Sequence, residues 1–146
     1  QRWLTRQLND PFVAEAKSRG FRSRAALKLE QIDDRYRLFQ PGMAVVDLGC
    51  APGGWMQVAS MRTRLGQGLA RLVGIDLLET EIIVDADIFV GDMMDNAMLV
   101  QVREAVGGAA DGVLSDMAAD TTGHRPTDHL RTTALLEAAL DFALSI

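Results

Sequence analysis

The chain has few of the features that secreted and membrane proteins carry. Cys50 is the only cysteine among 146 residues, so no internal disulfide can form. No apolar run approaches the length of about 20 residues that crosses a bilayer, and no signal-peptide pattern opens the sequence. We therefore expect a single cytoplasmic domain over residues 1–146 that does not bind a membrane.

The sequence also has little that could hold a metal ion. His124 and His129 are the only two histidines; they flank Asp128 and lie near Asp120. This spacing matches none of the common zinc patterns, and Cys50 is far away in the sequence. We therefore expect no metal site.

Positive charge is scarce outside the first 28 residues. The net charge of the chain is −5, but residues 1–28 hold seven basic and two acidic residues. That segment therefore carries +5, which leaves −10 for everything after it. A basic segment of this kind can bind a nucleic acid backbone, although it can equally be an ordinary solvated surface. The arginines Arg22 and Arg24 are candidates for phosphate contacts.

Short apolar runs alternate with helical patterns along the whole chain, which predicts an α/β fold with a mainly parallel sheet and helices on both faces. A basic helical segment, residues 1–40, would precede a βα core, residues 41–146. Asp10 and Pro11 favour a helix start, and Ser23 is the expected cap of a second helix. The expected helices cover about 11–19, 55–65, 96–106 and 127–146, with a further helix that follows Ser23 and extends at least to Ile32, and the expected strands cover 43–48, 71–76, 88–91 and 112–115.

A glycine-rich turn follows the first of these strands and holds Gly49, Gly53 and Gly54. Its spacing is not that of a phosphate-binding P-loop, and Ala51 stands where the dinucleotide fingerprint requires a glycine. S-adenosylmethionine (SAM), which contains no phosphate, fits this shorter loop better. A plain strand-to-helix turn is the alternative interpretation.

Four expected strands end at or near an aspartate, namely Asp47, Asp76, Asp92 and Asp116. The carboxyl ends of parallel strands meet at one edge of a sheet, where ligands bind. Asp76 is placed to accept hydrogen bonds from the hydroxyl groups of a ribose, Asp92 to accept a hydrogen bond from an adenine amino group, and Asp116 to attract a sulfonium cation. Trp55, next to the glycines, is expected as a lid or core ring.

Five segments together resemble the FtsJ/RrmJ group of ribosomal RNA 2′-O-ribose methyltransferases; they are residues 21–29, 46–55, 74–78, 91–92 and 114–118. The resemblance implies a Rossmann-like SAM-dependent methyltransferase that acts as a monomer on a uridine ribose in large-subunit (23S-type) ribosomal RNA. It implies cofactor contacts in the glycine turn and at four further residues: Trp55, Asp76, Asp92 and Asp116. It also places Lys28 and Asp116 in a Lys-Asp-Lys-Glu catalytic set, with Lys28 beside the RNA.

Two departures from the family pattern affect these expectations. Ala119 and Asp120 replace a Pro-Asn pair, which changes a loop near the expected RNA path. The second lysine and the glutamate of the catalytic set would lie beyond Ile146, so the sheet should stop after its fourth strand and the following helix. Two alternatives therefore remain: a non-catalytic module that binds SAM or RNA, and a 2′-O-methyltransferase that acts on tRNA or an mRNA cap.

Overall fold

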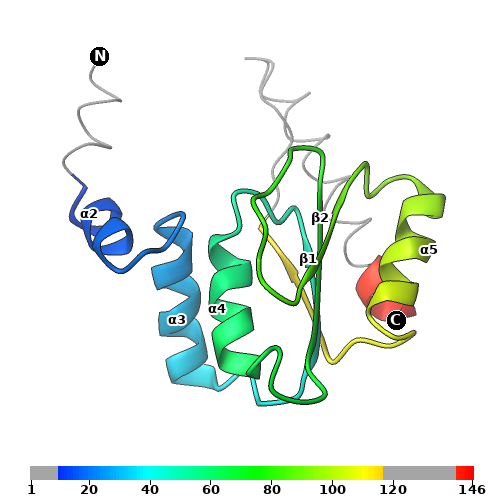
Figure 1. The fold of residues 1–146 in the computed structure, drawn as a ribbon, viewed down its shortest axis with the longest axis horizontal. Helices are drawn as coiled ribbons and strands as arrows, with labels where there is room; N and C mark the ends of the chain where they lie inside the picture. The colour runs from blue at the N-terminus through cyan, green and yellow to red at the C-terminus, as the bar shows by residue number, and fades with distance from the viewer. Residues whose placement is uncertain (1–9, 117–140) are drawn as a thin grey trace.

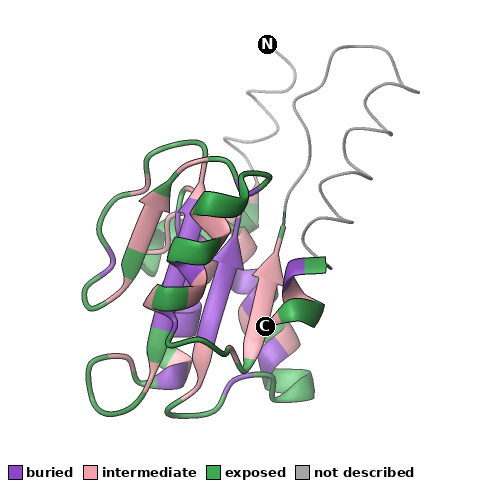
Figure 2. Ribbon diagram, turned by 90° about the vertical axis from the view of Figure 1, so that its right-hand side faces the viewer, coloured by how far each residue is buried: buried purple, intermediate pink, exposed green. Residues whose placement is uncertain are grey.

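A computed structural model describes residues 10–116 and 141–146 of the chain. In these residues four parallel strands form one sheet in the order β3-β2-β1-β4 (Figures 1 and 2). The strands are β1 (Ala44–Leu48), β2 (Arg71–Asp76), β3 (Asp87–Val90) and β4 (Gly112–Ser115). All four lie where the apolar runs predict strands, and β2 has the predicted bounds.

The strand β1 lies inside the sheet, with Val46 beside Val73 of β2 and Val113 of β4. Four of its five residues are buried, as Figure 2 shows by the purple strand. Strands of a parallel sheet that are covered on both faces require such continuous apolar sequences. This requirement makes the charged residue Asp47, at the fourth position of β1, conspicuous.

Helices cover both faces of the sheet, which confirms the predicted fold class. The helices α3 (Ala25–Tyr36) and α4 (Gly54–Thr63) lie on one face (Figure 1), and Leu29, Met56 and Val45 belong to the same buried apolar cluster there. On the other face, α5 (Asn96–Ala105) and the helical residues 141–145 pack through Val102 and Phe142 against Val46 and neighbouring residues. None of the helices in the described residues is long and apolar enough to cross a membrane.

The N-terminal helix α2 (Pro11–Ser18) begins and ends where the sequence predicts. Its N-cap is Asp10, whose Oδ1 accepts a hydrogen bond of 2.8 Å from the Phe12 N–H. After the helix the backbone turns at Gly20, which has a φ of +78°. The prediction that Ser23 caps the next helix is wrong, because α3 begins one residue later, with Arg24 at the N-cap and no side-chain cap.

The remaining predicted helices agree with α4 and α5 to within two residues, and Asp95 caps α5. Of the predicted helix over residues 127–146, only residues 141–146 belong to the described part of the chain, and 141–145 are helical.

Candidate functional site

Three of the four strand-end aspartates interact at the carboxyl edge of the sheet. Asp47 is buried in β1, Asp76 ends β2, and Asp116 follows β4. The charges of Asp116 and Asp76 both act on Asp47, so the three carboxylates lie near one another. Asp92 follows the edge strand β3; it is exposed, and its Oδ1 accepts a hydrogen bond of 2.8 Å from the Met94 N–H. The sequence therefore predicts correctly that these carboxylates lie at or near the ends of neighbouring strands.

The glycine turn after β1 is held by the end of β2. The backbone N–H groups of Gly49 and Cys50 both donate to the Ile75 carbonyl, at 2.8 and 3.1 Å. The Ala51 N–H donates to Asp76 Oδ2 at 2.9 Å, and the other oxygen of this carboxylate accepts from the Leu78 N–H at 2.9 Å. Asp76 is therefore a structural acceptor for two loops, and each of its oxygens keeps a further lone pair for a ligand.

The two adjacent glycines of the turn are required by a neighbouring segment of the protein. Gly53 has a φ of +110°, and a Cβ added there would lie 2.5 Å from Nη1 of Arg22. A Cβ at Gly54 would overlap the Ser23 hydroxyl. The groups that approach these two glycines closely therefore belong to the segment that leads into α3.

A cavity of about 140 Å³ opens beside this turn, bordered by Asp47, Asp116 and the start of α4. Asp47 is 1% exposed, and its Oδ1 has no hydrogen-bond partner among the described residues. Burial, followed by the nearby charges of Asp116 and Asp76, raises the pKa of Asp47 from 3.8 to about 7. The helix α4 begins without a side-chain cap, so its first N–H groups are available to an acceptor. The cavity therefore offers both an unsatisfied acceptor and unsatisfied donors.

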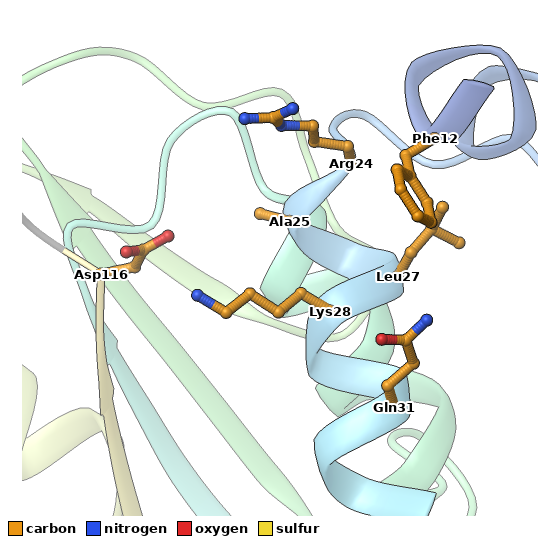
Figure 3. Close-up of a pocket in the computed structure, with 7 residues that line it drawn as sticks. All are labelled: Phe12, Arg24, Ala25, Leu27, Lys28, Gln31 and Asp116. Atoms are coloured by element: carbon orange, nitrogen blue, oxygen red, sulfur yellow. The ribbon is translucent and has the colours of Figure 1, made fainter. Parts of the chain in front are cut away.

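A second cavity of about 340 Å³ lies beside α3 (Figure 3). Arg24 and Lys28 border it together with Phe12 and Gln31, and the ammonium end of Lys28 points across it toward Asp116. Ala25 and Asp116 border both cavities, so the two hollows adjoin at these residues. The sequence predicts Lys28 and Asp116 as partners, and the structure brings them to opposite sides of one cavity.

Trp55 and Cys50 both pack within the site. The indole Nε1–H of Trp55 donates to the Ala25 carbonyl at 2.9 Å, which fixes α4 against α3. Cys50 is 3% exposed, and burial, which outweighs its hydrogen bond with Thr80, raises the pKa of its thiol to about 11. The thiol is therefore mostly un-ionised at neutral pH and a poor nucleophile. That Trp55 contacts a cofactor stays a prediction.

The three basic residues predicted to bind RNA have different surroundings. The Arg22 guanidinium donates to backbone carbonyls, whereas Arg24 forms an exposed ion pair with Asp10. Lys28 is exposed in the cavity beside α3. Phosphate binding by these residues stays a prediction, and it is best supported for Arg24 and Lys28, whose charged ends border an open cavity.

In residues 10–116 and 141–146, no three His, Cys, Asp or Glu side chains stand close enough to hold a metal ion. The residues His124 and His129, with Asp120 and Asp128, lie outside the described residues. The same is true of the departure from the family pattern at Ala119. The expectation that the chain binds no metal stays a prediction.

Sequence reasoning assigned no ligand to Asp47 and no site role to Ser23 or Ala25, although all three border the small cavity. The sequence does contain one indication that Asp47 belongs to a site. A carboxylate inside an otherwise apolar strand is costly to bury, so its presence indicates a ligand or a partner.

Comparison with known proteins places this site in a family. Residues 21–146 match the model of the FtsJ-like methyltransferases. The ribosomal RNA large subunit methyltransferase E of Acidiphilium cryptum is 56% identical over 143 residues, which are 98% of this chain and 61% of that protein. The protein of the same name from Rhodospirillum rubrum is 57% identical over 143 residues, covering 97% of this chain and 54% of the relative.

A solved structure is also similar. The crystal structure of a Plasmodium falciparum protein named as a ribosomal RNA methyltransferase matches with a TM-score of 0.73 and 29% identity. The match covers 84% of this chain and 70% of that one. The chain thus spans between half and two thirds of the length of the two bacterial relatives. On the matched sequence, strand order and fold, this chain belongs to the FtsJ-like methyltransferase family.

Proposed function

We propose that the chain is the part of a SAM-dependent methyltransferase that binds the methyl donor and begins the acceptor site. The reaction would be 2′-O-methylation of a uridine ribose in large-subunit ribosomal RNA. The observation that carries the proposal is the pair of adjoining cavities that share Asp116 and Ala25. One cavity is bordered by the glycine turn and a buried carboxylate, and the other by two cationic side chains. A transfer between two bound molecules requires such adjacent sites.

The small cavity fits the methionyl end of SAM. Its ammonium group would satisfy the free Oδ1 of Asp47, and its carboxylate would meet the uncapped start of α4. The remaining lone pairs of Asp76 suit the ribose hydroxyls, and Asp92 suits the adenine amino group. SAM supplies an electrophilic methyl group on a sulfonium.

The residues that border the cavity beside α3 act on the acceptor, which is the ribose hydroxyl that receives the methyl group. A ribose hydroxyl is a weak acid, so a fixed cation near its oxygen stabilises the alkoxide that develops during attack. Lys28 is placed for this role because its ammonium end points toward Asp116, where the two cavities meet (Figure 3). In this role Lys28 supplies positive charge and orientation to the acceptor.

The choice of substrate rests on the relatives. The bacterial proteins that match nearly the whole chain are named as methyltransferases of the ribosomal RNA large subunit, which favours this substrate over tRNA or an mRNA cap. We also propose that residues 1–146 fold as one domain, that the complete protein is a monomer, and that it acts in the cytoplasm.

The test uses a hybrid in which the 146 residues are followed by the C-terminal remainder of the Acidiphilium cryptum relative. We expect it to transfer tritiated methyl from SAM to large ribosomal subunits that lack the modification. Lys28→Ala should lower the rate by about a hundredfold, as the loss of a positioned charged group does. Lys17→Ala, an exposed lysine of α2, is the matched control.

The 146-residue chain alone should bind SAM in a calorimeter without transferring methyl, because the resemblance places half of the catalytic set beyond Ile146. Absence of SAM binding by both proteins would contradict the proposal. Transfer to tRNA or capped RNA but not to subunits would contradict only the substrate.

A further inference from the structure

Arg22 makes an unusual set of contacts for a residue in a basic segment. Its Nη1 donates to the carbonyls of Pro52, at 3.2 Å, and Glu81, at 2.8 Å, and its Nη2 donates to the Ile82 carbonyl at 2.8 Å. Pro52 belongs to the glycine turn after β1, whereas Glu81 and Ile82 belong to the loop after β2. One guanidinium therefore joins the two loops that follow the central strands.

The backbone around Arg22 is fixed as well. Its N–H donates to Gln57 Oε1 of α4 at 2.8 Å, and the amide nitrogen of the same glutamine donates to the Gly20 carbonyl at 3.0 Å. This pair of bonds ties the segment before α3 to the helix that follows the glycine turn. The guanidinium reaches the turn directly over Gly53, where a side chain would collide with it.

These contacts compete with phosphate binding. A guanidinium has five N–H donors in a planar fork, and three hydrogen bonds here are made to backbone carbonyls. An RNA phosphate that took this fork would leave those carbonyls without their charged donor. Among the described residues Arg22 forms no ion pair, whereas the exposed Arg24, two positions later, pairs with the half-buried Asp10 and borders the open cavity. The two arginines therefore have different tasks.

The bonded loops carry the residues that would hold SAM. The turn with Pro52 leads into Gly53, Gly54 and the start of α4, and the loop with Glu81 follows Asp76 at the end of β2. Asp76 and Arg22 thus connect the same two loops, one through the Ala51 N–H and the other through the Pro52 carbonyl. Removing Arg22 would leave Asp76 and the hydrogen bond between Cys50 Sγ and Thr80 Oγ1 as the side-chain links between them in the described structure.

We propose that Arg22 is a positioning residue of the SAM site, which holds the loops after β1 and β2 at a fixed separation, and that it is not an RNA phosphate ligand. This inference rests on the proposed function, because it assigns SAM to the site that the two loops form. The basic residues of segment 1–28 would then have two different roles. Arg22 organises the SAM site, whereas Arg24 and Lys28 face the RNA that accepts the methyl group.

The experiment compares Arg22→Ala and Arg22→Lys with the matched control Arg24→Ala. Calorimetry on the 146-residue chain measures SAM affinity, and filter binding of a ribosomal RNA fragment to the hybrid measures RNA affinity. Arg22→Ala should raise the Kd for SAM about tenfold, the effect of losing hydrogen bonds from a charged donor, and leave RNA affinity within about twofold. In the hybrid it should raise KM for SAM more than it lowers kcat. Arg24→Ala should show the reverse pattern in affinities.

Arg22→Lys retains the charge but not the planar fork, so its SAM affinity should lie between those of the wild type and the alanine variant. Circular dichroism and melting curves show whether each variant is folded. If Arg22→Ala does not fold, Arg22→Lys decides: an unchanged Kd for SAM with weaker RNA binding overturns the inference, and a raised Kd with unchanged RNA binding supports it. Failure of the wild type to bind SAM would refute the proposed function instead.

Discussion

The two adjoining cavities are built from different parts of the chain. The small cavity beside the glycine turn is bordered by loops that hydrogen bonds of the Ile75 carbonyl, Asp76 and Arg22 fix in place. The cavity beside α3 is bordered mainly by residues at the start of that helix, together with Phe12 and Asp116, and its charged residues are exposed. A change in the first should therefore alter the position of many groups, whereas a change in the second should remove one contact.

Among the substitutions that test this difference between the cavities, Gly54→Val should have the largest effect on SAM affinity and stability. A Cβ at position 54 would overlap the Ser23 hydroxyl and lie 3.5 Å from Ala26 Cβ, so the Ser23 side chain must rotate away and the two methyl groups of valine would press on the start of α3. We expect SAM affinity to fall by about a hundredfold or more and the melting temperature to drop by several degrees, as for overpacking that costs about 1–3 kcal/mol. Calorimetry and thermal melting check this.

The matched control for that substitution is Gly68→Val, because a Cβ at position 68 meets nothing within 4 Å. Equal SAM affinity in the two variants would show that the close approach at Gly54 does not shape the cavity.

Asp47→Asn should change the pH dependence of stability. Burial and the neighbouring carboxylates raise the pKa of Asp47 to about 7, whereas in the unfolded chain it returns to about 3.8. The folded state holds the proton of Asp47 more tightly than the unfolded chain does. The contribution of protonated Asp47 to the stability of the folded state is therefore complete below pH 3.8 and is lost as pH rises through 7. The wild-type melting temperature should fall between pH 5 and pH 8 relative to Asp47→Asn, without ligand.

Asp87→Asn serves as the control for this titration because Asp87 is exposed on β3. It should preserve the wild-type pH profile. A profile of Asp47→Asn that parallels the wild type would contradict a pKa near 7 for Asp47 in the folded protein.

Arg24→Gln should give the smallest effect, confined to RNA. Loss of one phosphate contact should reduce the slope of log affinity against log salt by about one, with a several-fold loss of affinity at low salt. SAM affinity should not change. Arg35→Gln, which alters an arginine over the Tyr36 ring, is the control. The same slope in Arg24→Gln and the wild type would remove Arg24 from the RNA interface.

The elements of this fold could be predicted because their signals are local. The apolar run from Arg71 to Asp76 and the cap at Asp10 are read from a few consecutive residues, and both are confirmed. The expected cap at Ser23 failed because a short polar side chain before a helix need not point at the helix start. In the structure Ser23 faces Gly54 instead.

The site was predicted less completely, because its geometry depends on residues that are far apart in sequence. The bonds of Arg22 join positions 30 to 60 residues away, and no local pattern indicates them. The environment of Asp47 depends in the same way on the ends of β2 and β4. Charge and motif spacing identify such residues as candidates, but the contacts that distinguish Arg22 from Arg24 can be seen only in the folded structure.

Gly74 has a consequence for how this sheet can vary in sequence. It lies beside Asp47 in the strand register, and a Cβ there would come within 2.8 Å of the sulfur of either Met56 or Cys50. Any larger residue at 74 must therefore be accompanied by smaller or displaced side chains at both positions 50 and 56. Related sequences should exchange volume among these three positions, and a mutant library that varies position 74 alone should return mainly glycine.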